Sequence, residues 1–269
     1  MYVNIFPDTV EIITNFIRTR IADADADGVV LGLSGGIDSA VTLSLVVSAL
    51  GPDKVHGLIM PFNETESIAM ADNHAKSLGV KTTTVNISEI VSAYKKSASF
   101  FLEKLSEGNL HSRVRMSLLY GQGFSSNYLV VGTSNKSELL IGYYTKWGDG
   151  ATDFLPIGDI YKSQIFTLGK LLEIPSEILN RKPTAELWPG QTDEEDLGFN
   201  YSDLDSVLFE LERFSSLSKI ADKTGFSATK INKISDLIKH SIHKRVFPPV
   251  CKIGLRTVGL DWRETIGSK

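Results

Sequence analysis

The sequence has little cysteine, no long hydrophobic run and no strong excess of one charge. Its single cysteine, Cys251, excludes an intrachain disulfide and a multi-cysteine zinc site, and suits a reducing cytosol. The longest nearly apolar run, residues 40–50, is too short to span a bilayer, and no signal peptide is recognisable. The net charge of −4 argues against a protein dedicated to coating nucleic acid. We therefore predict a cytoplasmic protein without membrane or nucleic-acid partners.

What is present is the composition of a folded protein. Of the 269 residues, 42% are hydrophobic and 22% are charged, which excludes a wholly disordered chain. A chain of this length can bury a full core. No shift in composition marks a boundary, so we treat residues 1–269 as a single domain.

Segments of strand and helix pattern alternate along the first half of the chain. Apolar β-type runs occupy residues 29–33, 55–60, 80–87 and 128–131, and helical patterns occupy residues 11–20, 39–50, 67–78 and 88–105. We expect the first helix to end before the three-fold Ala-Asp repeat at 22–27, because acidic side chains are unfavourable at a helix C-terminus. The alternation predicts an α/β fold with a doubly wound, mostly parallel sheet flanked by helices. Ligands of such sheets bind beyond the carboxyl ends of the strands.

The last third of the chain differs in its charge distribution. Residues 186–212 hold nine acidic side chains and no Lys or Arg, whereas residues 213–256 hold ten Lys or Arg and two acids. Such runs are usually solvated helix faces, but the asymmetry also permits a basic rim that gathers a polyanionic ligand. We expect a helical C-terminal portion here.

The strongest chemical signal is a glycine-rich segment between the first strand and its helix. Glycines let the backbone fold tightly and aim N–H groups at an anion, and the following helix adds the positive end of its dipole. The segment matches neither the Walker P-loop nor G-x-G-x-x-G. The alternative is an ordinary turn in which Asp38 or Ser39 caps the helix. The candidate phosphate-binding residues are Gly32, Leu33, Ser34, Gly35, Gly36, Ile37, Asp38 and Ser39.

This segment resembles S-G-G-x-D-S, the pyrophosphate-binding loop of the adenine-nucleotide α-hydrolase-like superfamily. Its members cleave ATP between the α and β phosphates. The resemblance implies that Ser34, Gly35, Gly36 and Ser39 cradle phosphate and that Asp38 is a ligand of Mg²⁺. It indicates the superfamily only, because asparagine synthetases, guanylate synthetases and tRNA-modifying enzymes carry related loops.

Three later segments narrow the choice. Residues 108–116 read G-N-L-H-S-R-V-R-M and place two arginines two positions apart, hence in different directions on a helix. Residues 130–138 follow a predicted strand and begin a predicted helix. Within them, Asn135 and Glu138 have the spacing of a capping box. The segment that follows is too rich in glycine and aromatic residues to be a helix. Residues 183–187 read P-T-A-E-L.

Together and in this order, the four motifs resemble the ammonia-dependent NAD⁺ synthetase family, from the opening helix to near Pro249. Two departures from the commonest bacterial pattern are Asn135-Lys136-Ser137 before Glu138 and Trp147 where tyrosine is frequent. Neither removes a group that the chemistry needs.

The resemblance implies a ligase that catalyses the last step of NAD⁺ biosynthesis. The family converts nicotinic acid adenine dinucleotide (deamido-NAD⁺), ATP and ammonia to NAD⁺, AMP and pyrophosphate through an acyl-adenylate, with Mg²⁺ and as a homodimer. The implied catalytic residues are Asp38, Asp153 and Lys162, and the implied Mg²⁺ ligands are Asp38 and Glu138. The implied contacts are Thr133, Lys162 and Thr184 with ATP, and Arg113, Lys146, Asp153, His243 and Lys244 with deamido-NAD⁺.

Some of these assignments have alternatives. His243 and Lys244 also suit any helix C-terminus that is followed by prolines. Asp153 is expected either to orient ammonia, to accept its proton or only to bind substrate. Residues 86–110 and 188–200 are candidate lids that exclude water from the acyl-adenylate.

Three other functions remain open. The first is another pyrophosphate-releasing enzyme, although a tRNA thiolase would normally need more cysteines and the length leaves no room for an amidotransferase domain. The second is a non-catalytic ATP sensor. The third is a DNA-binding regulator, because residues 219–239 faintly resemble a helix-turn-helix. The apolar face of the first helix suits either a dimer interface or the core.

Overall fold

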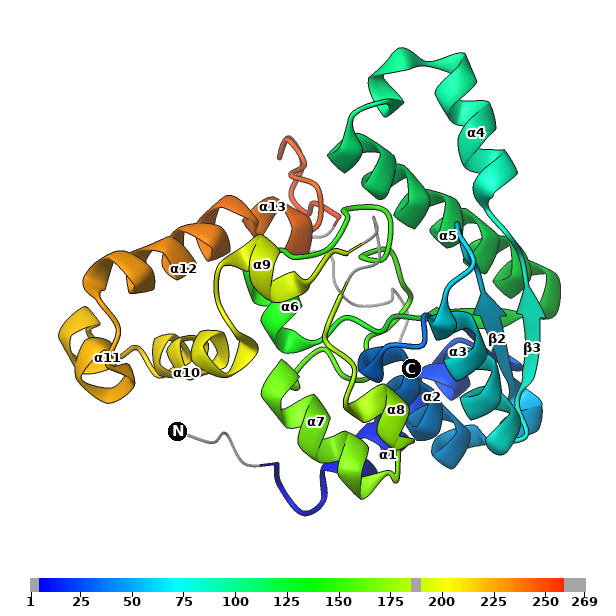
Figure 1. Ribbon diagram of the computed structural model, residues 1–269, viewed down its shortest axis with the longest axis horizontal. Coiled ribbons are helices and arrows are strands. Elements are labelled where there is room, and N and C mark those ends of the chain that lie inside the picture. Colours follow the sequence, from blue (N-terminus) through cyan, green and yellow to red (C-terminus); the bar gives the residue numbers. More distant parts are fainter. Residues whose placement is uncertain (1–4, 185–189, 259–269) are drawn as a thin grey trace.

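The centre of the fold is a sheet of four parallel strands, seen in a computed structural model that describes residues 5–184 and 190–258 (Figure 1). The strands are β1 (Gly28–Gly32), β2 (Val55–Ile59), β3 (Lys81–Thr84) and β4 (Tyr128–Val131). Their spatial order is β3-β2-β1-β4, so the direction of winding reverses between β1 and β4. This confirms the predicted doubly wound sheet and favours a ligand site where β1 and β4 end.

Helices cover both faces of the sheet. One layer contains α1 (Thr9–Asp23), α2 (Ile37–Leu50), α3 (Glu66–Ser77), α7 (Lys162–Leu171) and α8 (Ser176–Leu179), and the other contains α4 (Ser88–Ser97) and α5 (Lys104–Ser126). In β1, Val29 and Leu31 belong to the first hydrophobic core and Val30 to the second. All three are fully buried, which explains why this strand is apolar throughout rather than alternating.

Two helix boundaries differ from the sequence prediction. Helix α1 continues into the Ala-Asp repeat as far as Asp23, because Ile21 is buried and Arg20 pairs with Asp23 at 2.5 Å. The single helix expected over 88–105 is divided by a 3₁₀ turn at Ser99–Phe101. The turn lets the Phe101 ring contact that of Tyr94 edge-on, with α4 packed against α5 as a hairpin.

The helical C-terminal portion has a hydrophobic core of its own, beside the sheet (Figure 1). Its elements are α6 (Lys136–Ile141), α9 (Asp193–Leu197), α10 (Tyr201–Glu212), α11 (Leu217–Thr224), α12 (Ala228–His240) and α13 (Ile242–Arg245). The acidic and basic stretches of the sequence meet here in ion pairs, Lys223–Glu210 at 2.6 Å and Lys230–Asp203 at 3.0 Å. The predicted charge asymmetry is thus partly neutralised within the fold.

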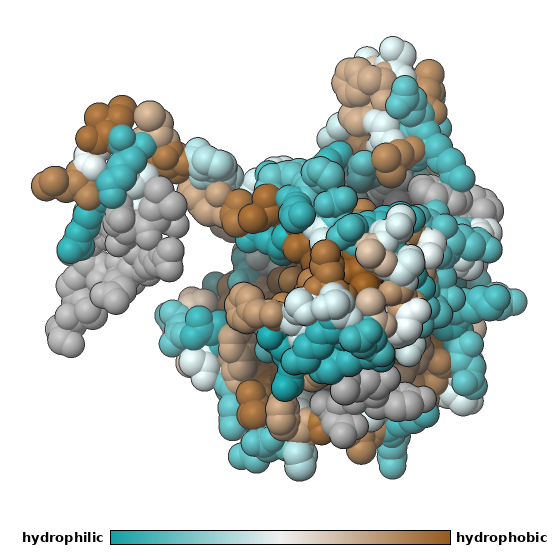
Figure 2. All heavy atoms as spheres, turned by 90° about the vertical axis from the view of Figure 1, so that its left-hand side faces the viewer, coloured by the Kyte–Doolittle hydropathy of each residue, from teal (hydrophilic) through white to brown (hydrophobic). Residues whose placement is uncertain are grey.

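The hairpin of α4 and α5 projects from the body (Figure 1), and Figure 2 shows hydrophobic side chains at its tip among hydrophilic ones. Phe100, Leu102 and Leu105 are each more than half exposed there. Within the described residues, no helix combines the length and the apolar character needed to cross a membrane.

Candidate functional site

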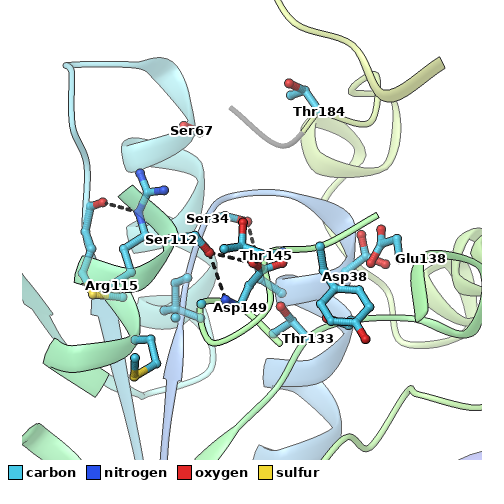
Figure 3. A pocket seen from close by; sticks show the side chains of 18 of the residues that line it. Ser34, Asp38, Ser67, Ser112, Arg115, Thr133, Glu138, Thr145, Asp149 and Thr184 are labelled. Atoms are coloured by element: carbon cyan, nitrogen blue, oxygen red, sulfur yellow. Dashed lines mark hydrogen bonds between the residues drawn. The ribbon is translucent and has the colours of Figure 1, made fainter. Parts of the chain in front are cut away.

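A cavity of about 1040 Å³ opens at the carboxyl ends of β1, β2 and β4. Figure 3 shows Asp38 and Glu138 on one side of it and Arg115 on the other, with Asp149 between them. A cavity of this volume is at the upper end of the range for small-molecule sites. The sequence-predicted residues that line it are Gly32, Leu33, Ser34, Asp38, Ser39, Thr133, Glu138, Lys162, Thr184 and Lys244.

The glycine-rich segment forms the turn between β1 and α2. Gly35 has a φ of 76°, and a Cβ atom there would overlap the backbone carbonyl of Ser67, so the position requires glycine. Helix α2 begins after Gly36 without a side-chain cap. Instead, the Ser39 hydroxyl donates to the Gly36 carbonyl at 2.9 Å. The alternative in which Asp38 or Ser39 caps the helix is therefore wrong, and the Asp38 side chain is directed to the cavity. Gly35, Gly36 and Ile37 do not line the cavity.

A buried charged cluster lies at the switch point of the sheet. The Lys162 ammonium donates to Asp38 Oδ2 at 2.5 Å and to Glu138 Oε1 at 3.2 Å. These side chains are 3%, 17% and 15% exposed, respectively. The Asn135 amide donates to Asp38 Oδ1 at 2.9 Å. The first turns of α2, α6 and α7 thus bring together residues that are more than 120 positions apart in the chain.

Glu138 serves two purposes at once. Its Oε2 accepts the Asn135 backbone N–H at 3.3 Å, while the Asn135 side chain accepts the Glu138 N–H at 3.1 Å, which confirms the predicted capping box. The second oxygen, Oε1, binds Lys162. The structural and the functional interpretation of this residue are therefore compatible.

The cluster places one ammonium group against two carboxyl groups. Burial raises the pKa of Glu138 to about 8; Lys162 opposes this shift, while the nearby carboxylates of Asp38 and Asp193 add to it. Burial alone would lower the pKa of Lys162, but Asp38 and Glu138 outweigh it and raise that pKa. The ammonium therefore stays charged, whereas Glu138 is largely protonated near pH 7 and would be ionised by a cation bound beside it.

Asp38 and Glu138 fit a magnesium ion as two of its ligands. An ammonium group already binds both carboxylates, so their geometry admits a cation. Among residues 5–184 and 190–258, no group of three or more His, Cys, Asp or Glu side chains could hold a metal. Mg²⁺ is commonly held by one or two carboxylates together with substrate phosphates and water, and two carboxylates meet here.

Several cavity residues were missed by the sequence prediction. Asp149 Oδ1 accepts the Ser112 hydroxyl at 2.6 Å and the Thr145 N–H at 2.9 Å, although Asp149-Gly150 alone would indicate only a turn. Arg115 donates to the Met60 carbonyl at 3.0 Å. The available signal was the arginine pair at 113 and 115, of which the second faces the cavity.

Asp193 was also missed. It is 3% exposed, lines the cavity and accepts the Tyr201 hydroxyl at 2.9 Å. Burial raises its pKa, and the Lys162 charge opposes the shift. In the sequence this residue was only one of a run of acids, so no local signal distinguished it.

Four of the residues predicted to bind deamido-NAD⁺ are absent from the cavity wall: Arg113, Lys146, Asp153 and His243. Arg113 is exposed on α5 and donates to the Lys146 carbonyl at 3.3 Å. Asp153 accepts the Val130 N–H of β4 at 2.7 Å and the Tyr120 hydroxyl of α5 at 3.2 Å. These contacts are structural and place Asp153 outside the cavity, so its catalytic role stays a prediction that its position does not support.

The fifth residue of that set, Lys244, reaches the cavity. Its ammonium donates to the carbonyls of Gly142 and Tyr144 at 2.6 and 2.7 Å. The neighbouring Arg245 donates to the Leu139 and Leu140 carbonyls near the end of α6. The basic residues of α13 thus bind the C-terminal end of α6 through tertiary contacts.

Comparison with known proteins identifies the family. A family model described as NAD synthase matches residues 9–248. The chain belongs to the NAD synthase family. It is 42% identical to the NH₃-dependent NAD⁺ synthetase of Thermococcus sibiricus over 88% of this chain and 93% of the relative.

Two solved structures of similar fold agree. An NMN synthetase from Francisella tularensis is 34% identical, with a TM-score of 0.83. The match covers 93% of this chain and all of that chain. The NH₃-dependent NAD synthetase from Campylobacter jejuni, solved with a nitrate ion, is 31% identical, with a TM-score of 0.80 and the same coverage. These matches confirm the family that the four sequence motifs indicate.

Two predicted features of the NAD synthase resemblance fall partly outside the described residues. Thr184 of the P-T-A-x-L motif lines the cavity, whereas residues 185–187 lie outside. The candidate lid at 188–200 contains α9, but residues 188 and 189 are likewise outside. The other candidate lid, 86–110, consists mainly of α4 and the start of α5. Lid motion stays a prediction.

Proposed function

We propose that this protein is an ammonia-dependent NAD⁺ synthetase, which converts deamido-NAD⁺, ATP and ammonia to NAD⁺, AMP and pyrophosphate. The observation that carries the proposal is the buried cluster of Lys162, Asp38 and Glu138 at the switch point of an NAD synthase fold. A charged lysine between two carboxylates is suited to a substrate that arrives as a polyphosphate with its cation.

ATP would place its phosphates against the turn between β1 and α2. The Ser34 and Ser39 hydroxyls line the cavity there, and the α2 N-terminus adds its positive dipole end. Thr133 and Thr184 lie on the cavity wall as further contacts. Bound Mg²⁺, held by Asp38 and Glu138, would neutralise phosphate charge.

The reaction has two balanced steps. The nicotinate carboxylate attacks the α-phosphorus, a phosphorus–oxygen bond forms, and pyrophosphate leaves. Ammonia then attacks the acyl carbon, a carbon–nitrogen bond forms, and the carbon–oxygen bond to AMP breaks. AMP leaves, and the nitrogen releases one proton to give the amide. An anionic nucleophile is repelled by ATP, so Lys162 contributes by placing fixed positive charge where the phosphates meet the attacking group. Closure of the candidate lids would limit access of water to the acyl-adenylate.

The second substrate would bind between the cavity and the exposed face of α5. Arg113 and Lys146 are adjacent on this face, and Tyr120, two turns along the helix, contacts Asp153. Arg113 and Asp153 are exposed in one chain, so we propose that a second copy completes the site in a homodimer. Phe124 is 93% exposed on the same helix, and its ring offers apolar area for such an interface.

The first helix borders the same region. Phe16 of α1 is 39% exposed and contacts Phe154 edge-on at 6.0 Å between ring centroids. Phe154 follows Asp153 directly, so the outer face of α1 supports the proposed interface, whereas Ile13 and Ile17 belong to the core. A cytoplasmic location remains a prediction from the sequence.

The decisive experiment is an assay with ATP, Mg²⁺, ammonium and deamido-NAD⁺, with glutamine in place of ammonium as control. We expect NAD⁺, AMP and pyrophosphate in equal amounts with ammonium and almost none with glutamine. A folded protein that forms no NAD⁺ would contradict the proposal and favour the ATP sensor.

A second candidate follows from the similarity to the Francisella NMN synthetase. In that case the acceptor would be nicotinic acid mononucleotide, which presents the same carboxylate without the adenosine half. The two acceptors should be compared at equal concentration. A higher kcat/KM for deamido-NAD⁺ supports the main proposal, and the reverse order supports the second candidate.

A further inference from the structure

A buried carboxylate from the helical C-terminal portion lies behind the charged cluster. Asp205 of α10 is 1% exposed and does not line the cavity. Its Oδ2 accepts the backbone N–H of Ser163 at 2.8 Å. Because Ser163 is the second residue of α7, the carboxylate lies at the positive end of that helix dipole. Asp205 thus binds the first turn of the helix that carries Lys162.

A single hydroxyl links Asp205 to the two helices that carry Glu138 and Lys162. Ser137 of α6 is fully buried, and its Oγ donates to Asp205 Oδ1 at 2.5 Å. The same Oγ accepts the Lys162 backbone N–H at 2.9 Å. Ser137 directly precedes Glu138 in the chain. One side chain therefore joins the first turn of α6, the first turn of α7 and the carboxylate of α10.

We propose that Asp205 and Ser137 are positioning residues, which hold α6 and α7 in register so that Lys162 and Glu138 keep their catalytic geometry. Hydrogen bonds to a carboxylate are stronger than neutral ones, so this junction is rigid. The distance from Lys162 Nζ to Glu138 Oε1 is 3.2 Å, and displacements of about 1 Å are enough to slow an oriented reaction substantially.

The helix that supplies Asp205 also touches the cluster directly. Tyr201, at the start of α10, places its ring 5.1 Å from Lys162 Nζ, measured to the ring centroid. Helix α10 therefore contacts the start of α7 through the Ser163 backbone and the ammonium group of Lys162 through Tyr201. The inference rests on the proposed function, because its kinetic test uses that reaction.

The first test removes only the linking hydroxyl. Ser137→Ala leaves the bond between Asp205 and Ser163 in place, and we expect kcat to fall about ten- to hundred-fold. KM for ATP and for deamido-NAD⁺ should change less than about three-fold, because substrate contacts are intact. Ser137→Thr keeps a hydroxyl and should recover most of kcat. The matched control is Ser206→Ala, which deletes an α10 hydroxyl bonded to the Asp203 carbonyl.

The second test removes the charge. Asp205→Asn keeps the size of the side chain and should lower kcat by a similar factor. Asp203→Asn on the same helix removes a carboxylate that pairs with Lys230 near the surface, and it should leave kcat unchanged. The inference would be overturned if kcat fell equally in Asp205→Asn and Asp203→Asn. It would also be overturned if Ser137→Ala kept its kcat, or if the kcat of Ser137→Thr were no higher than that of Ser137→Ala.

A third measurement does not depend on turnover. In a crystal structure of the Ser137→Ala protein, we expect Lys162 Nζ and Glu138 Oε1 to move beyond 4 Å. An unchanged cluster would overturn the inference, whatever the assay shows. A wild-type protein without NAD⁺ synthesis would instead contradict the proposed function, so the two failures are distinguishable.

Discussion

The cavity and the outer face of α5 hold their charged groups in different ways. In the cavity, Lys162, Asp38 and Glu138 bind one another with little exposure to water. On the outer face, Arg113 is exposed and reaches only a backbone carbonyl, that of Lys146. The buried groups are fixed before any ligand arrives, whereas the exposed groups need a ligand or a second chain to order them. We therefore expect cavity variants to affect catalysis and outer-face variants to affect substrate affinity.

The largest effect should follow a change in the cavity cluster. Asp38→Ala removes one carboxylate partner of Lys162 and one proposed Mg²⁺ ligand, and we expect kcat to fall by ~10³-fold or more. Circular dichroism and thermal unfolding should show an intact fold. Asp72→Ala, which removes a surface carboxylate paired with Lys76, serves as the control. Retained activity in Asp38→Ala would contradict the expectation that cavity residues, unlike those of the outer face of α5, govern catalysis.

The turn below the cavity should be the next most sensitive position. Gly35→Ala combines a positive φ with a clash against the Ser67 backbone, so we expect a loss of about 2–4 kcal/mol in the free energy of unfolding. Gly225→Ala is a matched control, because its backbone is left-handed with a φ of 73° and nothing lies within 4 Å of the added Cβ. It should cost only about 1–2 kcal/mol. Equal losses in urea denaturation would show that Ser67 yields to the new atom.

On the outer face, Arg113→Ala should act on one substrate. We expect KM for deamido-NAD⁺ to rise about ten-fold, which corresponds to about 1.4 kcal/mol, while KM for ATP and kcat stay nearly constant. Arg213→Ala, a cation beside Phe209 in the C-terminal portion, is the control. A fall in kcat without a change in KM would show that Arg113 acts in catalysis, as the cavity residues do, and would contradict the distinction between the cavity and the outer face of α5.

A further effect should be a dependence of stability on pH, which arises beneath the cavity wall. Burial and the charge of Arg115 lower the pKa of His111 to about 4, and its ring stacks on Phe62 at 4.1 Å between centroids. The unfolded chain takes up this proton near pH 6.5 and the folded chain only near pH 4. The free energy of unfolding should therefore fall as pH is lowered from about 6.5 to about 4, by at most about 1.4 kcal/mol per unit.

The comparison that isolates this contribution is with His111→Gln, which cannot titrate. Urea unfolding of both proteins at pH 7 and pH 5 should show a smaller decrease for the variant. His74 and His56 also have lowered pKa values and remain in both proteins, so only the difference between the two decreases is informative. Equal decreases in the free energy of unfolding of the two proteins would show that His111 accepts a proton in the folded state as readily as in the unfolded chain.

The strands and the glycine-rich turn between β1 and α2 could be predicted because their signals are local. Apolar runs marked β1, β2 and β4 and a threonine-rich run marked β3, each within a few residues, and the glycines before Asp38 marked the turn. The boundary of α1 could not be predicted, because the burial of Ile21 is a tertiary effect that outweighs the unfavourable Ala-Asp repeat. The break between α4 and α5 likewise depends on packing of Phe101 against Tyr94.

The sequence by itself determined the order of strands and helices, the glycine-rich turn and the family, because each depends on neighbouring residues and on motifs of short spacing. Only the tertiary structure decided which charged side chains meet. Lys162 and Asp38 are 124 positions apart, and the reversal of winding between β1 and β4 brings them to 2.5 Å. It also placed Asp149 and Asp193 on the cavity wall and left Asp153 outside, because burial and contact are set by packing between elements rather than by local pattern.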